Sequence, residues 1–448
     1  MEKPLRMSSY TIPVKLENDD GKYMLIHGYT GAIDIVSEKL LDMIKNPVAK
    51  DFKEDTLALL IRRGYLTNKQ EEEEWEYVTR VAEALHKKEK ILYKTFTWII
   101  TYNCNFRCPY CFENRKIKDG ESSIVFSKSQ VDKTLSIMDK IEPNAKLRSN
   151  IITLYGGEPL LKENQDIIEY IVKKAIERGY KLHVITNGYD LNHFFHLFGE
   201  NKICDIQVTI DGTKDFHNKT RIHHQDFNTF DKIINNIEYI LKNTDDVKIK
   251  VRVNTDKNNI EDFLNLRKYF EKKNFFKSEK FSIYSALIYD NKSITEKDKY
   301  NVKFMSSHEY LSSHLKANTI KYCNGYHGLL YRIKDAIQKK HALYLSPTYC
   351  SAQTSGYVFS PLGEIYPCWE VIGRPEYVIG KISGDTIVWD TGILNEWRSY
   401  NIGKTSCVKC KYALLCGGGC HATKHNNCQL FKRILIKAAK DAAAMSNF

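Results

Sequence analysis

Three cysteines stand four and three positions apart in the stretch Cys104-Asn105-Phe106-Arg107-Cys108-Pro109-Tyr110-Cys111. The apolar run at 95–101 leads directly into them, so a buried strand ends where the three thiols gather. A 4Fe–4S cluster is normally held by four thiolates. Three thiolates leave one iron open to a small molecule, and the spacing therefore indicates an iron–sulfur centre built for chemistry. A zinc site is disfavoured, because structural zinc sites use paired Cys-x2-Cys units.

The other cysteines also indicate metal. The chain has 12 cysteines, and 11 of them fall in the two regions 104–111 and 323–428. We expect the chain in the cytoplasm, because its start lacks the apolar core of a signal peptide, and disulfides are rare there. Clustered cysteines in such a chain favour metal centres. Only Cys204 stands apart, and its apolar neighbours predict a buried structural thiol.

The totals restrict the class of protein. The 448 residues are enough for about two or three domains, and no stretch approaches the apolar length of a membrane span. The formal net charge of +12 favours attraction of an acidic peptide or an acidic redox protein. Nucleic acid is not expected as a partner, because no basic patch is interleaved with aromatic residues.

Alternating strand and helix patterns follow the first cysteine. Six strand candidates with amphipathic helices between them imply an α/β fold, with a parallel sheet and helices outside it. Six strands are too few for an eight-stranded barrel, so we expect an open, partial (β/α)6 barrel of the TIM type. The expected strands are Phe96–Tyr102, Asn150–Tyr155, Lys181–Thr186, Asp205–Asp211, Lys248–Asn254 and Lys280–Ile288.

Unusual residues follow the ends of these strands. They are the cysteine loop, Gly156-Gly157-Glu158-Pro159, Asn187 and Asp211. Active sites of parallel α/β folds lie at the carboxyl ends of the strands. We therefore expect these residues to meet there.

Residues 1–92 have the pattern of a separate winged-helix-like domain. Two alternating stretches predict a hairpin, and two short helices follow, the first capped by Ser37 and the second ended by Gly64. A longer helix that opens with four glutamates links this domain to the next, and we expect its acidic start to be solvated. The expected elements are strands at 10–16 and 23–27 and helices at 38–44, 53–63 and 70–90.

The remaining predicted domains follow along the chain. The partial barrel occupies 93–289, and residues 290–346 form a bridging region. Residues 347–428 change to short apolar pieces, Gly and Pro turns and cysteines, with a hairpin at 357–366. Residues 429–448 are expected to form a basic, alanine-rich helix.

The cysteine loop and the glycine stretch together resemble a known family. Cys-x3-Cys-x2-Cys followed by Gly-Gly-Glu-Pro is similar to the motif pair of the radical S-adenosylmethionine (radical SAM) enzymes, and the resemblance covers 95–289. It implies that Cys104, Cys108 and Cys111 hold a 4Fe–4S cluster whose open iron binds S-adenosylmethionine (SAM). In that family a flavodoxin- or ferredoxin-type reductant supplies an electron to the cluster. The reduced cluster cleaves SAM to a 5′-deoxyadenosyl radical, which abstracts hydrogen from the substrate.

The resemblance also implies contacts to SAM. Tyr110 matches the position whose ring lies near the adenine, and Gly156-Gly157-Glu158-Pro159 matches the segment that binds the methionyl amine. Arg221 matches the arginine that pairs with the SAM carboxylate, a task that suits its planar fork. Asn187 is expected to contact the ribose or the methionine.

The C-terminal cysteines resemble the SPASM extension of radical SAM enzymes, which holds auxiliary 4Fe–4S clusters. By this resemblance the chain carries two auxiliary clusters and three clusters in all. Cys323 is the only upstream candidate for the fourth ligand of the second auxiliary cluster, which otherwise keeps an open iron for a substrate thiolate. The implied ligands are Cys407, Cys410, Cys416 and Cys428 for the first auxiliary cluster, and Cys350, Cys368 and Cys420 for the second.

SPASM enzymes mostly modify peptides or proteins, and the N-terminal domain favours a peptide maturase. It resembles the domain with which many such maturases bind a leader peptide, which adds a strand to an exposed sheet edge. We therefore expect a ribosomally made precursor peptide as the substrate. The expected product is a Cys thioether crosslink, as in sactisynthases and ranthipeptide maturases, and carbon–carbon crosslinking is the close alternative.

Two further alternatives follow from particular residues. Anaerobic sulfatase-maturing enzymes, which form formylglycine, carry an Asp directly after the hairpin cysteine as catalytic base, whereas Trp369 and Glu370 follow Cys368 here. Glu370 is the candidate base, acting from a displaced position. An electron-transfer protein with three clusters is the non-enzyme alternative, and the intact cysteine and glycine motifs argue against it.

Overall fold

The computed structural model describes residues 3–17, 21–111, 113, 123–289, 302–423 and 427–446. The chain forms two compact units, one of residues 1–90, 314–354 and 399–448 and one of residues 91–313 and 355–398. The predicted cysteine-rich domain is therefore divided between the units, and the predicted domain boundaries stay predictions. The start of the predicted bridging region, 290–301, lies outside the described residues.

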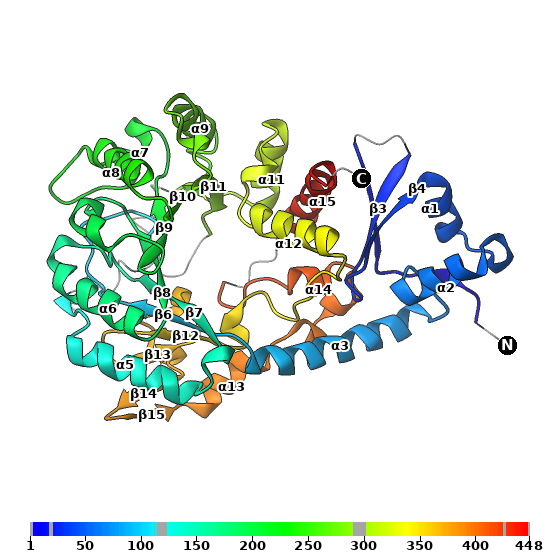
Figure 1. Cartoon of the computed structure of the whole chain (residues 1–448), viewed down its shortest axis with the longest axis horizontal. Coiled ribbons are helices and arrows are strands. Elements are labelled where there is room, and N and C mark those ends of the chain that lie inside the picture. Colours follow the sequence, from blue (N-terminus) through cyan, green and yellow to red (C-terminus); the bar gives the residue numbers. More distant parts are fainter. Residues whose placement is uncertain are drawn as a thin grey trace. The chain divides into compact units, whose positions relative to one another are not determined.

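Six parallel strands, β6 to β11, form the centre of the second unit (Figure 1). Their order is β11-β10-β9-β8-β7-β6, so strands that follow one another in sequence are neighbours in the sheet, and helices lie outside them (Figure 1). This confirms the predicted α/β fold. The strands are β6 Lys94–Ile99, β7 Arg148–Tyr155, β8 Lys181–Thr186, β9 Ile203–Thr209, β10 Lys248–Thr255 and β11 Phe281–Leu287, and the helices are α5 Lys128–Ile141, α6 Gln165–Glu177, η5 Leu191–Leu197, α7 Lys214–Thr220, α8 Thr229–Asn243 and α9 Asp262–Lys272.

The strands alternate between buried apolar and partly exposed polar residues. In β10, Ile249, Val251 and Val253 are fully buried, while Arg252 and Asn254 are not. Because side chains alternate along a strand, Arg252 and Asn254 share the face opposite the apolar residues. This polar face can hold polar molecules at the carboxyl ends of the strands.

The sheet continues beyond β6. The predicted hairpin at 357–366 is confirmed as β12 and β13, but its place was not predicted: β12 pairs with β6 in parallel, Val358 opposite Thr97. Two further antiparallel strands extend this edge. The bounds are β12 Gly356–Phe359, β13 Glu364–Tyr366, β14 Gly380–Ser383 and β15 Thr386–Trp389, followed by α13 Thr391–Ser399.

The N-terminal residues form a three-stranded antiparallel sheet with two helices. Both predicted helix signals are confirmed: Leu40 N–H donates to the Ser37 hydroxyl at 3.2 Å, and Gly64 ends its helix with a φ of +92°. The third strand, β4, was not predicted, and it pairs with β3 on the side opposite β2. The elements are β1 Arg6–Met7, β2 Thr11–Lys15, β3 Lys22–His27, β4 Ile33–Ser37, α1 Glu38–Lys45, α2 Glu54–Arg63 and β5 Leu66–Thr67.

The long helix α3, Glu71–Ile91, opens with four glutamates, and one of them is buried. Glu74 is 0% exposed, and its carboxylate accepts hydrogen bonds from Arg6 Nη2 at 2.7 Å and Tyr29 Oη at 3.2 Å. The expectation of a fully solvated helix start is therefore wrong for Glu74. Its ion pair with Arg6 joins α3 to the N-terminal strands.

The rest of the first unit is helical and carries most of the C-terminal cysteines. Helix α15 packs beside α12 (Figure 1), and it buries Leu435, Ala438 and Ala439. The helices here are α12 Tyr326–Lys339, α14 Ala413–Cys416 and α15 Cys428–Ala444, and α11 Ser307–Lys316 crosses from the second unit into the first.

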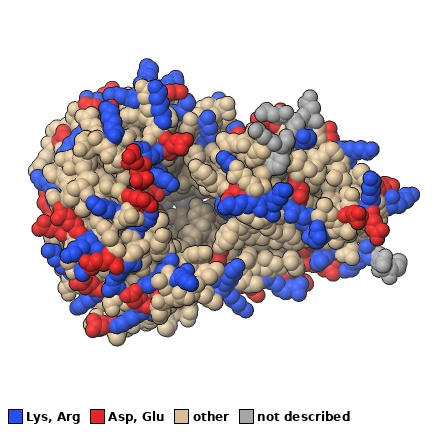
Figure 2. All heavy atoms as spheres, in the orientation of Figure 1, with Lys and Arg blue, Asp and Glu red and all other residues tan. Residues whose placement is uncertain are grey.

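No helix among the described residues is long and apolar enough to cross a membrane. Figure 2 shows Lys and Arg mixed with Asp and Glu over the visible face.

Candidate active site

The cysteine loop after β6 is held by the segment that follows α7. Arg107 N–H donates to the Ile222 carbonyl at 2.7 Å, and His224 N–H donates to the Asn105 carbonyl at 3.1 Å. Cys108 is buried, at 6% exposed, whereas Cys104 and Cys111 are half-buried. The loop is thus anchored through its backbone, and Phe106 N–H donates to Cys104 Sγ at 3.3 Å.

The three thiols lie within electrostatic reach of one another. Burial raises the pKa of each, that of Cys111 to about 12, and the Cys108 thiol adds to the shifts of Cys104 and Cys111. Bound iron would hold them as thiolates. Among the described residues no three side chains converge as the ligands of a single metal ion do. A 4Fe–4S cluster makes a different demand, because each thiolate binds its own iron, and the three thiols fit that demand.

Gly156 and Gly157 bring the loop after β7 against the cysteine loop. A Cβ on Gly156, whose φ is +129°, would lie 2.4 Å from the Thr101 carbonyl oxygen. A Cβ on Gly157 would lie 2.3 Å from the Asn103 carbonyl oxygen. Both positions exclude a side chain, and the backbone that they approach leads directly into Cys104.

Gly157→Ala is therefore expected to displace the backbone at 101–103 and to lower the occupancy of the 4Fe–4S cluster predicted at the cysteine loop. Overpacking of this kind costs about 1–3 kcal/mol. Iron and sulfide content, the electron paramagnetic resonance signal of the reduced protein and the melting temperature measure the effect. Gly328→Ala is the matched control, because a Cβ there meets nothing within 4 Å. Unchanged iron content and melting temperature in Gly157→Ala contradict the prediction.

Glu158 joins the loop after β7 to the loop after β8. Its carboxylate accepts hydrogen bonds from Leu160 N–H at 2.8 Å, the Thr186 hydroxyl at 2.7 Å and Asn187 N–H at 2.6 Å. Burial raises the pKa of Glu158 to about 7, and these hydrogen bonds oppose the rise. The structure thus gives Glu158 a positioning role, and its contact with the methionyl amine, like that of Pro159, stays a prediction.

Asn187 supports the cysteine loop through Asn105. Its Nδ2 donates to Asn105 Oδ1 at 2.7 Å, and its Oδ1 accepts from Tyr189 N–H at 2.9 Å. Asn105 Nδ2 donates in turn to Asp190 Oδ2 at 3.3 Å. Both ends of the Asn187 amide are engaged next to Cys104, and the predicted contact of Asn187 with SAM stays a prediction.

Tyr110, Asp211, Arg221 and Asn254 meet in one polar cluster. The Tyr110 hydroxyl donates to the Asp211 carboxylate and accepts from Arg221 Nη1 at 2.7 Å and from Asn254 Nδ2 at 3.3 Å. Burial raises the pKa of Tyr110 well above its usual value, so the phenol stays protonated. The cluster connects the cysteine loop to the carboxyl ends of β9 and β10.

Arg221 has an unused donor in this cluster. It is 8% exposed, its guanidinium lies 5.4 Å from the centre of the Phe106 ring, and its buried Nε has no hydrogen-bond partner among the described residues. A buried N–H without an acceptor is costly, and a carboxylate is the acceptor that a guanidinium binds best. The residues here fit the carboxylate of SAM.

A second group of titratable side chains lies near the end of β7. Burial raises the pKa of Glu113 to about 8, and the Glu370 carboxylate adds to the rise. The Glu370 carboxylate also contributes to raising the pKa values of Tyr155 and Arg252. The ring of Trp369 lies 5.9 Å from that of Tyr155. The candidate base Glu370 therefore lies near the carboxyl ends of the strands.

Four C-terminal cysteines gather in the first unit. Burial raises the pKa of Cys416 to about 11, and the thiols of Cys428, Cys407 and Cys410 add to the rise. Gly417, with a φ of +76°, turns the chain after Cys416 so closely that a Cβ would lie 2.1 Å from the Thr348 carbonyl oxygen. These are the four cysteines that the resemblance assigns to one auxiliary cluster.

The remaining predicted ligands differ in burial. All 12 cysteines lie among the described residues, and none is in a disulfide. Cys350 is exposed, and Cys368 and Cys420 are half-buried. Cys323 is buried just before α12, where the neighbouring Tyr326 hydroxyl donates to Asp441 in the last turn of α15. The role of Cys323 as a ligand stays a prediction.

Sequence reasoning did not single out Asn254, Arg252 and Glu113. Asn254 and Arg252 have a signal that could have been found, because polar residues at every second position of an otherwise apolar strand indicate a polar interior face. Asp211 was noticed as a residue after a strand and at the start of the stretch that ends at Arg221, without its contact to Tyr110. Glu113 has no signal in the sequence beyond its place two residues after Cys111.

Comparisons with known proteins agree with this geometry. Residues 98–270 match the model of the Radical SAM superfamily. The cysteine-type anaerobic sulfatase-maturating enzyme of Clostridium novyi (strain NT) is 24% identical over 360 residues, which cover 72% of this chain and 87% of the relative.

Two solved structures share the fold. Native anSMEcpe with bound AdoMet and Kp18Cys peptide is 20% identical, with a TM-score of 0.57 over 79% of this chain and 98% of that one. Streptococcus suis SuiB bound to precursor peptide SuiA is 14% identical, with a TM-score of 0.51 over 94% of this chain and 96% of that one. At these identities the likeness shows the fold.

Proposed function

We propose that this chain, an enzyme whose central part is a radical SAM domain, uses SAM and a 4Fe–4S cluster at its cysteine loop to modify a ribosomally made precursor peptide. The observation that carries the proposal is the polar cluster of Tyr110, Asp211 and Arg221. In it the buried Nε of Arg221 has no acceptor among the described residues, and a carboxylate would supply one. When bound, the 4Fe–4S cluster supplies the electron that cleaves SAM to the 5′-deoxyadenosyl radical. This chain's own residues bind and orient SAM.

The N-terminal sheet supports a peptide as the substrate. SuiB, whose fold covers 94% of this chain, was solved with a precursor peptide bound. Here β4 lies at one edge of the β2-β3-β4 sheet, and β3 is its only strand partner among the described residues. An extended leader peptide would add a strand to such an edge, because unpaired backbone groups there accept main-chain hydrogen bonds.

A groove beside β4 offers side-chain contacts for the same leader. It has a volume of about 420 Å³ and is lined by Asp34 of β4 and by Leu59, Arg62 and Arg63 of α2. Arg63 Nε is paired with Asp34 at 2.5 Å, whereas Arg62 makes no ion pair with a described residue. Leu59 is 44% exposed. An apolar and an acidic residue of the leader would suit Leu59 and Arg62.

Arg62→Glu combined with Leu59→Glu is expected to weaken binding of the precursor peptide about tenfold or more, because charge repulsion replaces attraction at the groove. Isothermal titration calorimetry with the full precursor measures the effect. Lys39→Glu, on the exposed part of α1, is the control for a charge reversal outside the groove. Equal affinity of the double variant and the control contradicts this place for the leader.

The predicted auxiliary clusters favour oxidative crosslinking to a Cys thiol. A thioether between a Cys sulfur and a carbon forms with the loss of two hydrogens. One leaves the carbon as a hydrogen atom for the 5′-deoxyadenosyl radical, and the other leaves the thiol as a proton. The electron that remains when the carbon–sulfur bond forms needs an acceptor. The cysteines that we propose as the first auxiliary ligands, Cys407, Cys410, Cys416 and Cys428, supply a place for such an acceptor.

Two other products are candidates for the same site. Carbon–carbon crosslinking has the same electron balance. Formylglycine formation is favoured by the similarity to the sulfatase-maturating enzyme of Clostridium novyi and by the position of Glu370 near Tyr155. It is disfavoured by Trp369, which stands directly after Cys368.

The test uses the enzyme reconstituted with iron and sulfide under anaerobic conditions, together with SAM, dithionite and any small Cys-containing peptide that proves to be encoded beside this gene. We expect 5′-deoxyadenosine and a peptide that has lost about 2 Da, with the crosslink mapped to a Cys sulfur by tandem mass spectrometry. Absence of 5′-deoxyadenosine overturns the radical SAM activity. Conversion of a sulfatase-derived Cys peptide to formylglycine, with no change in the precursor, replaces the thioether product by formylglycine.

A further inference from the structure

The four predicted ligands of the first auxiliary cluster come from two segments of the first unit. Cys407, Cys410 and Cys416 lie within residues 407–416, and Cys428 is the first residue of α15. The other three thiols add to the raised pKa of Cys416, so all four lie close together. The same unit holds the N-terminal sheet that we propose as the place of the leader.

Tyr10, just before β2, joins the first of these segments to the N-terminal sheet. It is 1% exposed, and its hydroxyl donates to the carbonyl of Val408, which lies between Cys407 and Cys410 in the sequence. Its own carbonyl accepts a hydrogen bond from Gly28 N–H, directly after β3, at 3.0 Å. Tyr10 therefore connects the backbone between two predicted ligands to the hairpin of β2 and β3.

The turn after β3 and helix α3 pack closely against the same segment. A Cβ on Gly28 would lie 2.1 Å from the Lys411 carbonyl oxygen, so this position excludes a side chain. The Lys409 ammonium lies 4.4 Å from the centre of the Trp75 ring on α3. Residues 407–411 are therefore in direct contact with both the hairpin and α3.

A buried apolar cluster continues this contact. The side chains of Cys407 and Cys410 pack against it. Because interiors pack densely, a change in the position of either thiol is transmitted to the side chains around it. The buried members of the cluster come from the N-terminal strands, from α3 and from the cysteine segments, and they are Tyr10, Val78, Ala82, Ile402, Ala413 and Leu414.

Helix α15 brings the fourth predicted ligand to the same sheet. It begins at Cys428 and packs against β2, which is the edge strand opposite β4. Lys440 Nζ of α15 lies 2.6 Å from Glu17 Oε1, just beyond β2. A cluster that binds Cys428 together with Cys407 and Cys410 would therefore tie both segments to one edge of the N-terminal sheet.

We propose that the first auxiliary cluster is a structural part of the leader-binding domain, so that the precursor peptide binds tightly only to a chain that carries this cluster. The inference rests on the proposed function, because it takes β4 as the edge that receives the leader. Ligation of the four thiols fixes both segments against β2 and α3, since the free energy of binding a metal centre that forms with the fold stabilises the fold. Strand β3 pairs with both β2 and β4 and so transmits this order to the leader's edge. A chain that lacks the auxiliary electron acceptor then does not engage its substrate.

Cys416→Ala tests the inference, because it removes one predicted ligand and leaves Tyr10 and Val408 in place. Hydrogen exchange of the full chain, read by mass spectrometry, measures the protection of each strand without turnover. We expect the variant to lose about 4 irons per chain. Exchange in β2, β3 and α15 should become faster, and the precursor peptide of the activity test should bind about tenfold more weakly in titration calorimetry.

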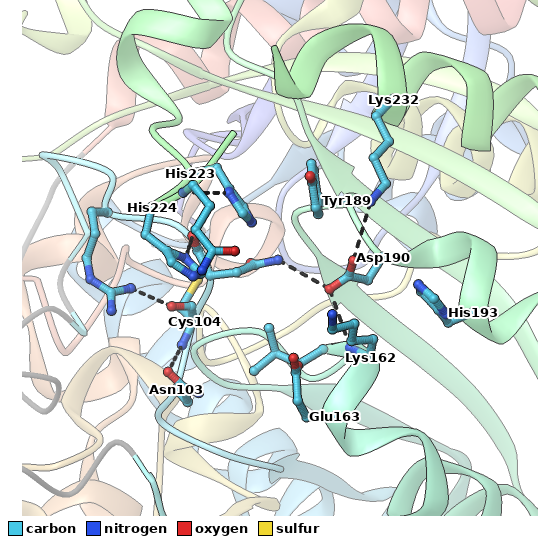
Figure 3. Close-up of a pocket in the computed structure, with 14 residues that line it drawn as sticks. Asn103, Cys104, Lys162, Glu163, Tyr189, Asp190, His193, His223, His224 and Lys232 are labelled. Carbon is cyan, nitrogen blue, oxygen red and sulfur yellow. Dashed lines mark hydrogen bonds and ion pairs between the residues drawn. The ribbon is translucent and has the colours of Figure 1, made fainter. Parts of the chain in front are cut away.

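Cys108→Ala is the matched control, because it removes a predicted ligand of a different cluster. Figure 3 shows the pocket beside Cys104, and every residue that lines this pocket belongs to the second unit. Loss of the cluster predicted there should also remove about 4 irons per chain. It should leave the exchange of β2 and the affinity for the precursor unchanged.

Tyr10→Phe separates the coupling from the loss of a ligand. It removes the hydroxyl that bonds the Val408 carbonyl and keeps the buried ring. The iron content should stay unchanged, the electron paramagnetic resonance signal of the auxiliary cluster should shift, and the precursor should bind about fivefold more weakly. Tyr23→Phe is the control in the same sheet, where the lost hydroxyl donates to Glu38 at 3.2 Å, and it should change none of these.

The inference is overturned if Cys416→Ala loses its irons yet keeps the exchange rates and the precursor affinity of the unchanged enzyme, or if Cys108→Ala weakens precursor binding equally. If Cys416→Ala unfolds as a whole, Tyr10→Phe decides, and identical behaviour of Tyr10→Phe and Tyr23→Phe overturns the coupling. Failure of the proposed function looks different. The unchanged enzyme then forms no 5′-deoxyadenosine or binds no precursor, while the protection of β2 still depends on Cys416.

Discussion

Cys108→Ala abolishes 5′-deoxyadenosine formation in the anaerobic assay with SAM and dithionite, with an expected fall of about a thousandfold or more. Loss of a residue that merely orients a metal ligand costs about 10–100-fold, and loss of a ligand exceeds this. Cys108 is the most buried of the three thiols and lies within electrostatic reach of Arg221, so no water-exposed side chain can take its place. Liquid chromatography of the quenched reaction measures the product.

Iron content separates this loss from a general failure to fold. With three clusters the unchanged enzyme holds about 12 irons per chain, and Cys108→Ala should hold about 8. Cys204→Ala is the control: Cys204 lies on β9, away from the cysteine loop, and is half-buried and not buried as predicted. Its thiol donates a hydrogen bond to the Leu182 carbonyl at 3.7 Å. Undiminished SAM cleavage in Cys108→Ala contradicts the assignment of the cysteine loop. A fall to about 8 irons supports both auxiliary clusters together.

The strands could be predicted because each one carries its own signal. All six parallel strands lie within a few residues of the predicted ranges, since alternating or continuous apolar runs between polar turns are local features. The unpredicted β4, Ile33–Ser37, is short and follows the hairpin directly, so its Ile-Asp-Ile alternation is brief. The pairing of β12 with β6 joins residues 356–359 to 95–98, and no local pattern encodes a contact at that separation.

The site was predictable where residue type and chemistry coincide, and less so where side chains support one another. Cysteine spacing indicates a cluster, and the glycines after β7 indicate a close backbone approach, which the structure shows to be an approach to the cysteine loop. The bond from Asn187 to Asn105 depends on two loops meeting, which a single sequence does not show. Likewise, the burial of Glu74 in a run of four glutamates depends on Arg6, from the other end of the domain.

Arg221→Gln is expected to weaken the binding of SAM about 30- to 150-fold, because a charge-assisted hydrogen bond to a carboxylate contributes about 2–3 kcal/mol and each 1.4 kcal/mol is about tenfold in affinity. The glutamine removes the charge and the fork geometry while keeping a donor near Tyr110. Calorimetric titration of SAM into the reconstituted, unreduced enzyme measures the dissociation constant without turnover.

A second substitution distinguishes SAM binding by Arg221 from a purely structural role. Arg221 also donates to Tyr110 and lies over Phe106, so its loss can disturb the cysteine loop. Arg221→Lys keeps the charge and loses the second donor of the fork, so we expect it to bind SAM more weakly than arginine and more tightly than glutamine. If both variants bind SAM as tightly as the unchanged enzyme while their melting temperatures fall, Arg221 serves the packing of the loop, and the carboxylate of SAM is bound elsewhere.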